Sequence, residues 1–242
     1  MIQEQFNINI FSIGPIYNKL LEGHKSPIYT APSITLPSPP PTVDYTYKKT
    51  ETNKHTSIEN IFVNYFNYNA SLASSSSMLN LADYYIYGTG EENSFLESLL
   101  LATDNTYRSF RLLNNNNNNS YVIKKKKLIS SETVLFVNGR DDIKQHYKTS
   151  NIKYKRIPHK LFTDKNIDHE NDTKILIADF MNIKVIILNI KHKQFRFLNI
   201  HNKMAPKLVI LIENKHKYEP ILAVNMTLMS LMSDYIIVNI PK

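Results

Sequence analysis

The sequence predicts an α+β fold in which a central, mostly antiparallel sheet packs against helices. The main observation is the stretch from Thr173 to Val224, which contains four apolar, β-branched or aromatic runs of strand length. The first two runs, and the last two, are separated by only about three polar residues. Such spacers suit antiparallel hairpins, because parallel neighbours need a crossover of about a dozen residues. A segment that is apolar on one side at helical spacing precedes these runs.

The predicted helix of this stretch covers Thr173–Asn182, and Thr173 or Asp172 can cap its start. The four predicted strands follow it in the order Ile183–Ile190, Gln194–Ile200, Lys207–Asn214 and Lys217–Val224.

The N-terminal quarter differs from the rest in composition. Residues 1–25 are predicted to hold a strand at Phe6–Phe11 and a short helix at Pro15–Glu22. Residues 26–56 are rich in Pro, Thr and Ser, without helical periodicity, and predict an extended arm or linker. This arm is either a disordered spacer or a segment that lies along a neighbouring subunit. Residues 57–242 are predicted to form the α+β domain.

The remaining elements of that domain follow from local patterns. An apolar stripe predicts a helix over Ser57–Ala73, and Ser131 can cap a helix that Gly139 interrupts. The other predicted elements are a strand at Asn151–Ile157, a short helix at Met226–Ser233 and a last strand at Tyr235–Ile240.

A glycine-containing loop precedes a strong helical pattern at Ser94–Thr103. Gly88 and Gly90 are two of only five glycines in the chain. Asn93 or Ser94 can cap the helix, and the acidic pair just before it lies at the positive end of the helix dipole. A glycine loop that leads into a helix N-terminus can hold an anion or an oxyanion, and it can equally be an ordinary turn.

An asparagine run and a lysine run lie between the predicted helices. Residues 114–127, which include Lys124, Lys125, Lys126 and Lys127, are predicted to be a surface insertion. The lysines are either a solvated face or a phosphate-binding patch. The formal net charge of +8 allows the same two interpretations, solubility or attraction to nucleic acid.

Composition excludes several classes of site. The chain has no cysteine, which excludes disulfides, thiolate nucleophiles and cysteine-bound zinc. The histidines lack metal-binding spacing, and neither a P-loop nor a dinucleotide fingerprint occurs, so neither metal nor cofactor is expected. We also expect no membrane span and no secretion signal. The absence of cysteine fits a reducing compartment. Abundant Asn, Lys, Ile and Tyr indicate an AT-rich genome, such as that of a large DNA virus or a protist.

Two segments give the chain a resemblance to a known family. NSFLESLL, Asn93–Leu100, places a residue at the start of a helix after a glycine loop, and HKYEPI, His216–Ile221, opens a predicted strand. Over residues 83–224 the order of parts resembles the ovarian-tumour (OTU) class of papain-like cysteine peptidases, especially OTU-like proteins of large DNA viruses. In that family a D-G-N-C-F-type segment places the nucleophilic cysteine at a helix N-terminus, and an H-Y-E-P or H-Y-D motif supplies the general base.

This chain departs from the family pattern at both reactive positions. Ser94 stands at the nucleophile position, Lys217 directly precedes Tyr218, and His216 is one place further out. A shift of one residue in a strand turns a side chain to the other face, and a serine needs a well-placed base. The resemblance therefore implies a papain-like fold with a degenerate site. No catalytic residue is expected there, and the positions of the site are Gly88, Gly90, Asn93, Ser94, His216 and Tyr218.

Three functions follow from these observations. The first is an inactive OTU-like domain that serves as a structural or interaction protein of a large DNA virus, in the virion or the host cytoplasm. Its partners would be other protein subunits, contacted through the 26–56 arm. The second is an active deubiquitinase-type hydrolase that uses Ser94 and His216. The third is a basic nucleic-acid-binding factor that uses Lys124–Lys127.

Overall fold

The computed structural model describes residues 47–52, 54–66, 80–113, 119–164, 166–199, 201–202, 205–223 and 228–240. These residues all belong to one unit that spans Tyr45–Lys242. The predicted strand at Phe6–Phe11, the predicted helix at Pro15–Glu22 and residues 26–46 of the predicted arm lie outside the described residues.

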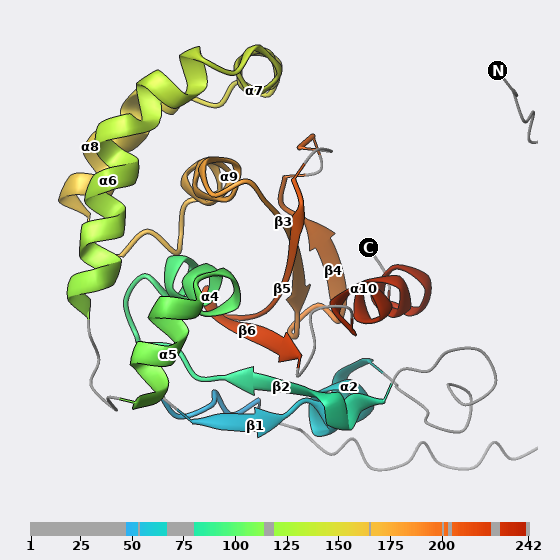
Figure 1. Cartoon of the computed structure of the whole chain (residues 1–242). Helices are drawn as coiled ribbons and strands as arrows, with labels where there is room; N and C mark the ends of the chain where they lie inside the picture. Colours follow the sequence, from blue (N-terminus) through green and yellow to red (C-terminus); the bar gives the residue numbers. More distant parts are fainter. Residues whose placement is uncertain are drawn as a thin grey trace, which may run out of the picture. The chain divides into compact units, whose positions relative to one another are not determined.

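A six-stranded sheet forms the centre of this unit, in the order β1-β2-β6-β5-β3-β4 (Figure 1). The hairpins β3–β4 and β5–β6 are antiparallel, as the short spacers predict. β3 and β5 pair in parallel, so the sheet is mostly rather than wholly antiparallel. The strands are β1 His55–Ser57, β2 Tyr84–Tyr87, β3 Ile183–Asn189, β4 Gln194–Phe197, β5 Lys207–Asn214 and β6 Lys217–Ala223.

Helices cover both faces of the sheet, which explains why β3 and β5 are apolar at nearly every position. Val185 and Ile187 enter one core together with residues of α4 and α9, whereas Ile186 and Leu188 enter the other with α2 and α10. The helices are α2 Glu59–Phe66, α4 Ser94–Thr103, α5 Asn105–Leu113, α6 Asn119–Asn138, α7 Asp141–Thr149, α8 Ile157–Thr163, α9 Asn171–Phe180 and α10 Leu228–Asn239, with short 3₁₀ turns η1 Leu81–Asp83 and η2 Tyr154–Arg156.

Two predicted strands are wrong. Residues 154–156 of the segment predicted as Asn151–Ile157 form η2, and Ile157 begins α8, where Pro158 suits the first turn of a helix. The segment predicted as a last strand, Tyr235–Ile240, is in α10 up to Asn239. Its buried positions continue the spacing of Met229 and Met232, because Ile236 and Ile240 follow at four-residue intervals.

The lysine run belongs to a helix rather than to a loop. Residues 119–127 of the predicted insertion form the first half of α6, which therefore begins before Ser131, the predicted start. The predicted break at Gly139 is confirmed, since α6 ends at Asn138 and α7 begins at Asp141. β2, which follows η1 directly, was not predicted, because four residues next to a glycine are too few to show a period.

The turn between β5 and β6 is strained. Lys215 and His216 connect the strands, with φ of 50° and 63°. A two-residue hairpin turn with positive φ at both positions favours Asn-Gly, because a Cβ is unfavourable in this conformation. Neither Lys nor His relieves that strain.

We expect the double substitution Lys215→Asn/His216→Gly to raise the free energy of unfolding by about 1 kcal/mol, because the new pair suits positive φ. Urea denaturation would measure the change. His192→Gly is the matched control: His192 lies in the β3–β4 turn and is not among the described residues with positive φ. That control should lose stability, and a double variant no more stable than the parent would contradict the assignment of strain.

Candidate functional site

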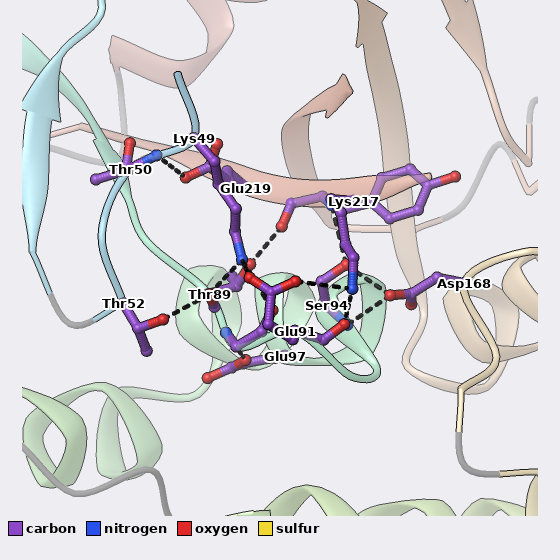
Figure 2. A network of polar contacts seen from close by, with 12 residues as sticks. Lys49, Thr50, Thr52, Thr89, Glu91, Ser94, Glu97, Asp168, Lys217 and Glu219 are labelled. Atoms are coloured by element: carbon purple, nitrogen blue, oxygen red, sulfur yellow. Dashed lines mark hydrogen bonds and ion pairs between the residues drawn. The ribbon is translucent and has the colours of Figure 1, made fainter. Parts of the chain in front are cut away.

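The N-terminus of α4 lies against the beginning of β6, and a carboxylate from a third segment caps it (Figure 2). Asn93 occupies the N-cap with φ of 55° but makes no capping bond through its side chain. Asp168 accepts the amide hydrogens of Ser94 at 2.8 Å and Phe95 at 3.0 Å instead. A negative charge is favoured at this end of a helix, so Asp168 replaces the predicted local cap.

The hydroxyl of Ser94 is fully engaged within the protein. Its Oγ donates to Asp168 Oδ2 at 2.6 Å and accepts the Tyr218 amide hydrogen at 2.9 Å. Both Ser94 and Asp168 are 0 % exposed. Ser98 and Thr89 donate to the Tyr218 carbonyl at 3.0 and 2.7 Å. These bonds attach the first residues of β6 to side chains of α4 and of the loop before it.

A buried polar chain continues from the side chain of Tyr218. The Lys174 ammonium, on α9, donates to the Tyr218 hydroxyl at 2.7 Å and to the Asp168 carbonyl at 3.1 Å. The Tyr218 hydroxyl in turn donates to Glu213 Oε1 at 2.7 Å. Burial lowers the pKa of Lys174 to about 8, since Lys174 is only 2 % exposed. The network thus joins α4, α9, β5 and β6.

Lys217 and His216 point to different partners. The Lys217 ammonium contacts the Glu91 carbonyl and lies 3.2 Å from its carboxylate, while Lys49 approaches the same carboxylate at 3.0 Å (Figure 2). These two lysines lower the pKa of Glu91 through their hydrogen bonds. The exposed His216 ring lies 4.9 Å from that of His169. Within the described residues, Ser94 Oγ bonds to Asp168 and Tyr218, and not to His216.

The two loop glycines serve packing rather than anion binding. A Cβ on Gly88 would lie 2.1 Å from the Glu51 carbonyl oxygen, so glycine is required where these backbones meet. The Gly88 amide donates to the Lys54 carbonyl at 2.8 Å, and that of Gly90 to Glu97 Oε2 at 2.7 Å. Both amides are therefore bonded to groups of the protein.

The end of the predicted arm is part of this site. Residues 47–52 run past β6, where Glu219 accepts the Thr50 amide hydrogen at 3.0 Å (Figure 2). The Tyr47 hydroxyl also donates to Glu219. Burial raises the pKa of Glu219. Glu219, the glutamate of the KYEP segment, thus anchors the chain that leads into β1. His55 and Thr56 were predicted to belong to the arm, but they pair with β2 in the sheet.

A pocket of about 290 Å³ opens beside the start of α4. Glu97 at its base receives the Arg111 guanidinium in a buried ion pair and the Tyr107 hydroxyl at 3.2 Å. The lining residues are Thr52, Gly90, Glu91, Glu92, Glu97, Tyr107, Arg111 and Val122. Of the three carboxylates in this lining, Glu97 is paired with Arg111, Glu91 is paired with Lys49 and Lys217, and Glu92 is exposed.

The lysine run contributes one residue to the site. Lys126 is 6 % exposed and donates to Asn93 Oδ1 at 3.0 Å and to the Asp164 carbonyl at 2.7 Å. Lys124 and Lys127 are exposed, and Lys125 is half-buried. The four lysines therefore point to several sides of α6 and do not form one patch.

Sequence reasoning located Ser94, Asn93 and Tyr218 but missed the residues that hold them. Asp168 lies in a short polar segment without periodicity, and Lys174 looks like an ordinary helix lysine. Glu219 was visible within the KYEP segment, as part of the family resemblance and not as an anchor. Only the fold brings these side chains together.

Two kinds of site can be checked within the described residues. There, no group of three or more His, Asp or Glu side chains is arranged to hold a metal ion. No helix in the same ranges combines the length and apolarity needed to cross a membrane. Comparison with known proteins gives no assignment, since neither a family model nor a curated protein matches the chain.

We expect Asp168→Asn to lower the free energy of unfolding by about 2–4 kcal/mol, because it removes the charge that accepts three hydrogen bonds at a buried helix N-terminus. Chemical denaturation monitored by circular dichroism would measure it. Asp164→Asn, an exposed aspartate in the same loop, should stay within about 0.5 kcal/mol of the parent. Equal effects of the two substitutions would refute the proposed role of Asp168.

Stability should rise with pH between about 8 and 10 because of Lys174. Its pKa is about 8 in the folded protein and 10.5 ordinarily, so in this window the unfolded chain keeps a proton that the folded chain releases. The gain is up to about 1.4 kcal/mol per pH unit. Urea unfolding at pH 8, 9 and 10 would show it, and Lys174→Met should flatten the slope. An unchanged slope in that variant would assign the effect elsewhere.

Proposed function

We propose that this chain is an OTU-like domain without peptidase activity, which acts as a structural or interaction protein in the virion or an assembly complex of a large DNA virus. The observation that supports the absence of activity is the hydrogen bonding and burial of the Ser94 hydroxyl. Its hydrogen is bonded to Asp168, its lone pair receives the Tyr218 amide, and neither Ser94 nor Asp168 is exposed. A buried nucleophile that is bonded on both sides cannot reach a substrate carbonyl.

The general base of a peptidase is also missing from this arrangement. A base must lie within hydrogen-bond reach of the nucleophile, directly or through one water. Lys217 stands at the position of the family's histidine, and its ammonium forms an ion pair with Glu91. Asp168 is within reach of Ser94, but two amides also bond to it and hold it as a helix cap. These contacts support a structural role for Ser94 and Asp168 in place of a catalytic one.

A role in binding fits the remaining features better than a hydrolase does. The chain carries a net charge of +8, and the proline-rich segment precedes the part that Glu219 anchors to β6. In this proposal the domain is a stable body from which the preceding segment reaches other subunits. The lysine run favours nucleic acid less, because Lys126 is directed into the protein.

We expect the full-length protein to release no fluorophore from a ubiquitin C-terminal fluorogenic substrate, at enzyme concentrations at which an active deubiquitinase gives complete turnover. Ser94→Ala should behave identically in this assay. The same variant should be less stable by about 1–3 kcal/mol, because the Tyr218 amide loses its acceptor. Hydrolysis by the parent that Ser94→Ala abolishes would overturn the proposal.

A further inference from the structure

A second pocket lies on α7, far from Ser94. Its volume is about 610 Å³, and its lining comprises Asp141, Lys144, Gln145, Lys148, Ile152 and Tyr154. Figure 1 shows α7 beyond the end of α6, on the side away from α5 and β1. This feature, the α7 groove, is therefore separate from the site at the start of α4.

Two lysines and one aspartate line the α7 groove, and three more cations lie next to a lining residue in the sequence. Lys144 and Lys148 line it, and Lys153, Lys155 and Arg156 are within one or two residues of its lining residue Tyr154. All five are exposed, and none takes part in a salt bridge within the described residues. Asp142 nearby is neutralised by Arg140 at 2.8 Å, which leaves Asp141 as the lining carboxylate. The groove thus has an excess of positive charge.

The helical spacing explains how the groove acquires these charges. Lys144 and Lys148 are four residues apart and share one side of α7, because Ile143 and Tyr147 are buried on another side. Exposed lysines on a helix are commonly only a solvated face. Here they border a hollow, and the chain turns directly after α7 to bring Ile152 and Tyr154 into its wall.

Tyr154 gives the groove an aromatic wall. Its ring is half-buried, lies 6.1 Å from the Tyr147 ring, and its hydroxyl reaches Asn138 Oδ1 at 3.4 Å. Packing against Tyr147 restrains the ring while it still lines the groove. A restrained ring at the edge of a basic groove is the combination that single-stranded nucleic acid binding uses, with stacking for bases and cations for phosphates.

We propose that the α7 groove binds single-stranded nucleic acid, with Lys144, Lys148 and Lys153 at the phosphates and Tyr154 stacked on a base. An acidic lipid surface is a poorer fit, because the exposed large apolar side chains of the described residues lie elsewhere than on α7 or η2. This inference does not rest on the loss of peptidase activity, and neither outcome of the fluorogenic assay bears on it.

The test is the fluorescence anisotropy of a labelled 20-nucleotide poly-dT strand titrated with the full-length protein at 50, 100 and 200 mM salt. Three phosphate contacts give a slope of log affinity against log salt near −2, or about 20-fold weaker binding between 50 and 200 mM. Lys144→Gln/Lys148→Gln/Lys153→Gln should weaken binding at least about tenfold and flatten the slope.

Matched variants decide between this groove and general basicity. Lys124→Gln/Lys125→Gln/Lys127→Gln removes the same number of charges from α6 and should change affinity less than about threefold. Tyr154→Leu should weaken binding about fivefold or more, whereas Tyr154→Phe keeps the ring and should bind like the parent. Thermal unfolding would verify that all variants fold. Equal losses in both lysine triples, an equal affinity for duplex of the same length, or binding to anionic vesicles but not to poly-dT would overturn the proposal.

Discussion

The buried carboxylate of Asp168 is the interaction on which the rest of this structure depends. It caps α4 and fixes the Ser94 hydroxyl, which then receives the first amide of β6 after Lys217. A carboxylate with no exposed surface is costly unless donors surround it, and three donors do so here. The helix, the strand and the loop before α9 are therefore held by one group.

Buried polar contacts continue from Asp168 along β6. Tyr218 is bonded at its amide, its carbonyl and its hydroxyl, so its strand position is set from three sides. Glu219, the next residue, points to the opposite face and holds the segment at Tyr47 and Thr50. The backbone of Tyr218 thus secures α4, its side chain secures α9, and the side chain of Glu219 secures the entry to β1 from the other face. Buried polar networks in which most groups are bonded favour one arrangement of the elements.

The sequence predicted those parts that local periodicity determines. The hairpins β3–β4 and β5–β6, helix α9 and the break at Gly139 follow from spacing within a few residues. Pairing between distant strands could not be predicted in this way, since nothing in the local pattern indicates that β3 and β5 pair in parallel. Tyr235–Ile240 was misjudged because its β-branched residues fit either period, and only the contacts of α10 with the sheet decide.

The sequence predicted several residues of the candidate site but not the residues that they contact. Ser94 and Tyr218 were located by resemblance, yet the partner that determines the state of Ser94 is 74 residues away. The sequence placed His216 one residue out of register in a strand, whereas in the structure it lies in the β5–β6 turn and its ring contacts that of His169. The lysine run was judged by its charge alone, whereas helical geometry turns one of its members inward.

The bond from Lys126 to Asn93 does not require one exact length of the lysine run. Lys126 sits three places before Ile129, which is fully buried, and each of its two preceding neighbours is also a lysine. If the run gained or lost one residue, the place three before that isoleucine would still hold an ammonium group. The mismatch in phase would pass to the residues before the run, and it would turn the buried Val122 and the Asp104-bonded Tyr121 to another side of α6. The bond to Asn93 therefore depends on the composition of the run, whereas the residues before the run limit its length.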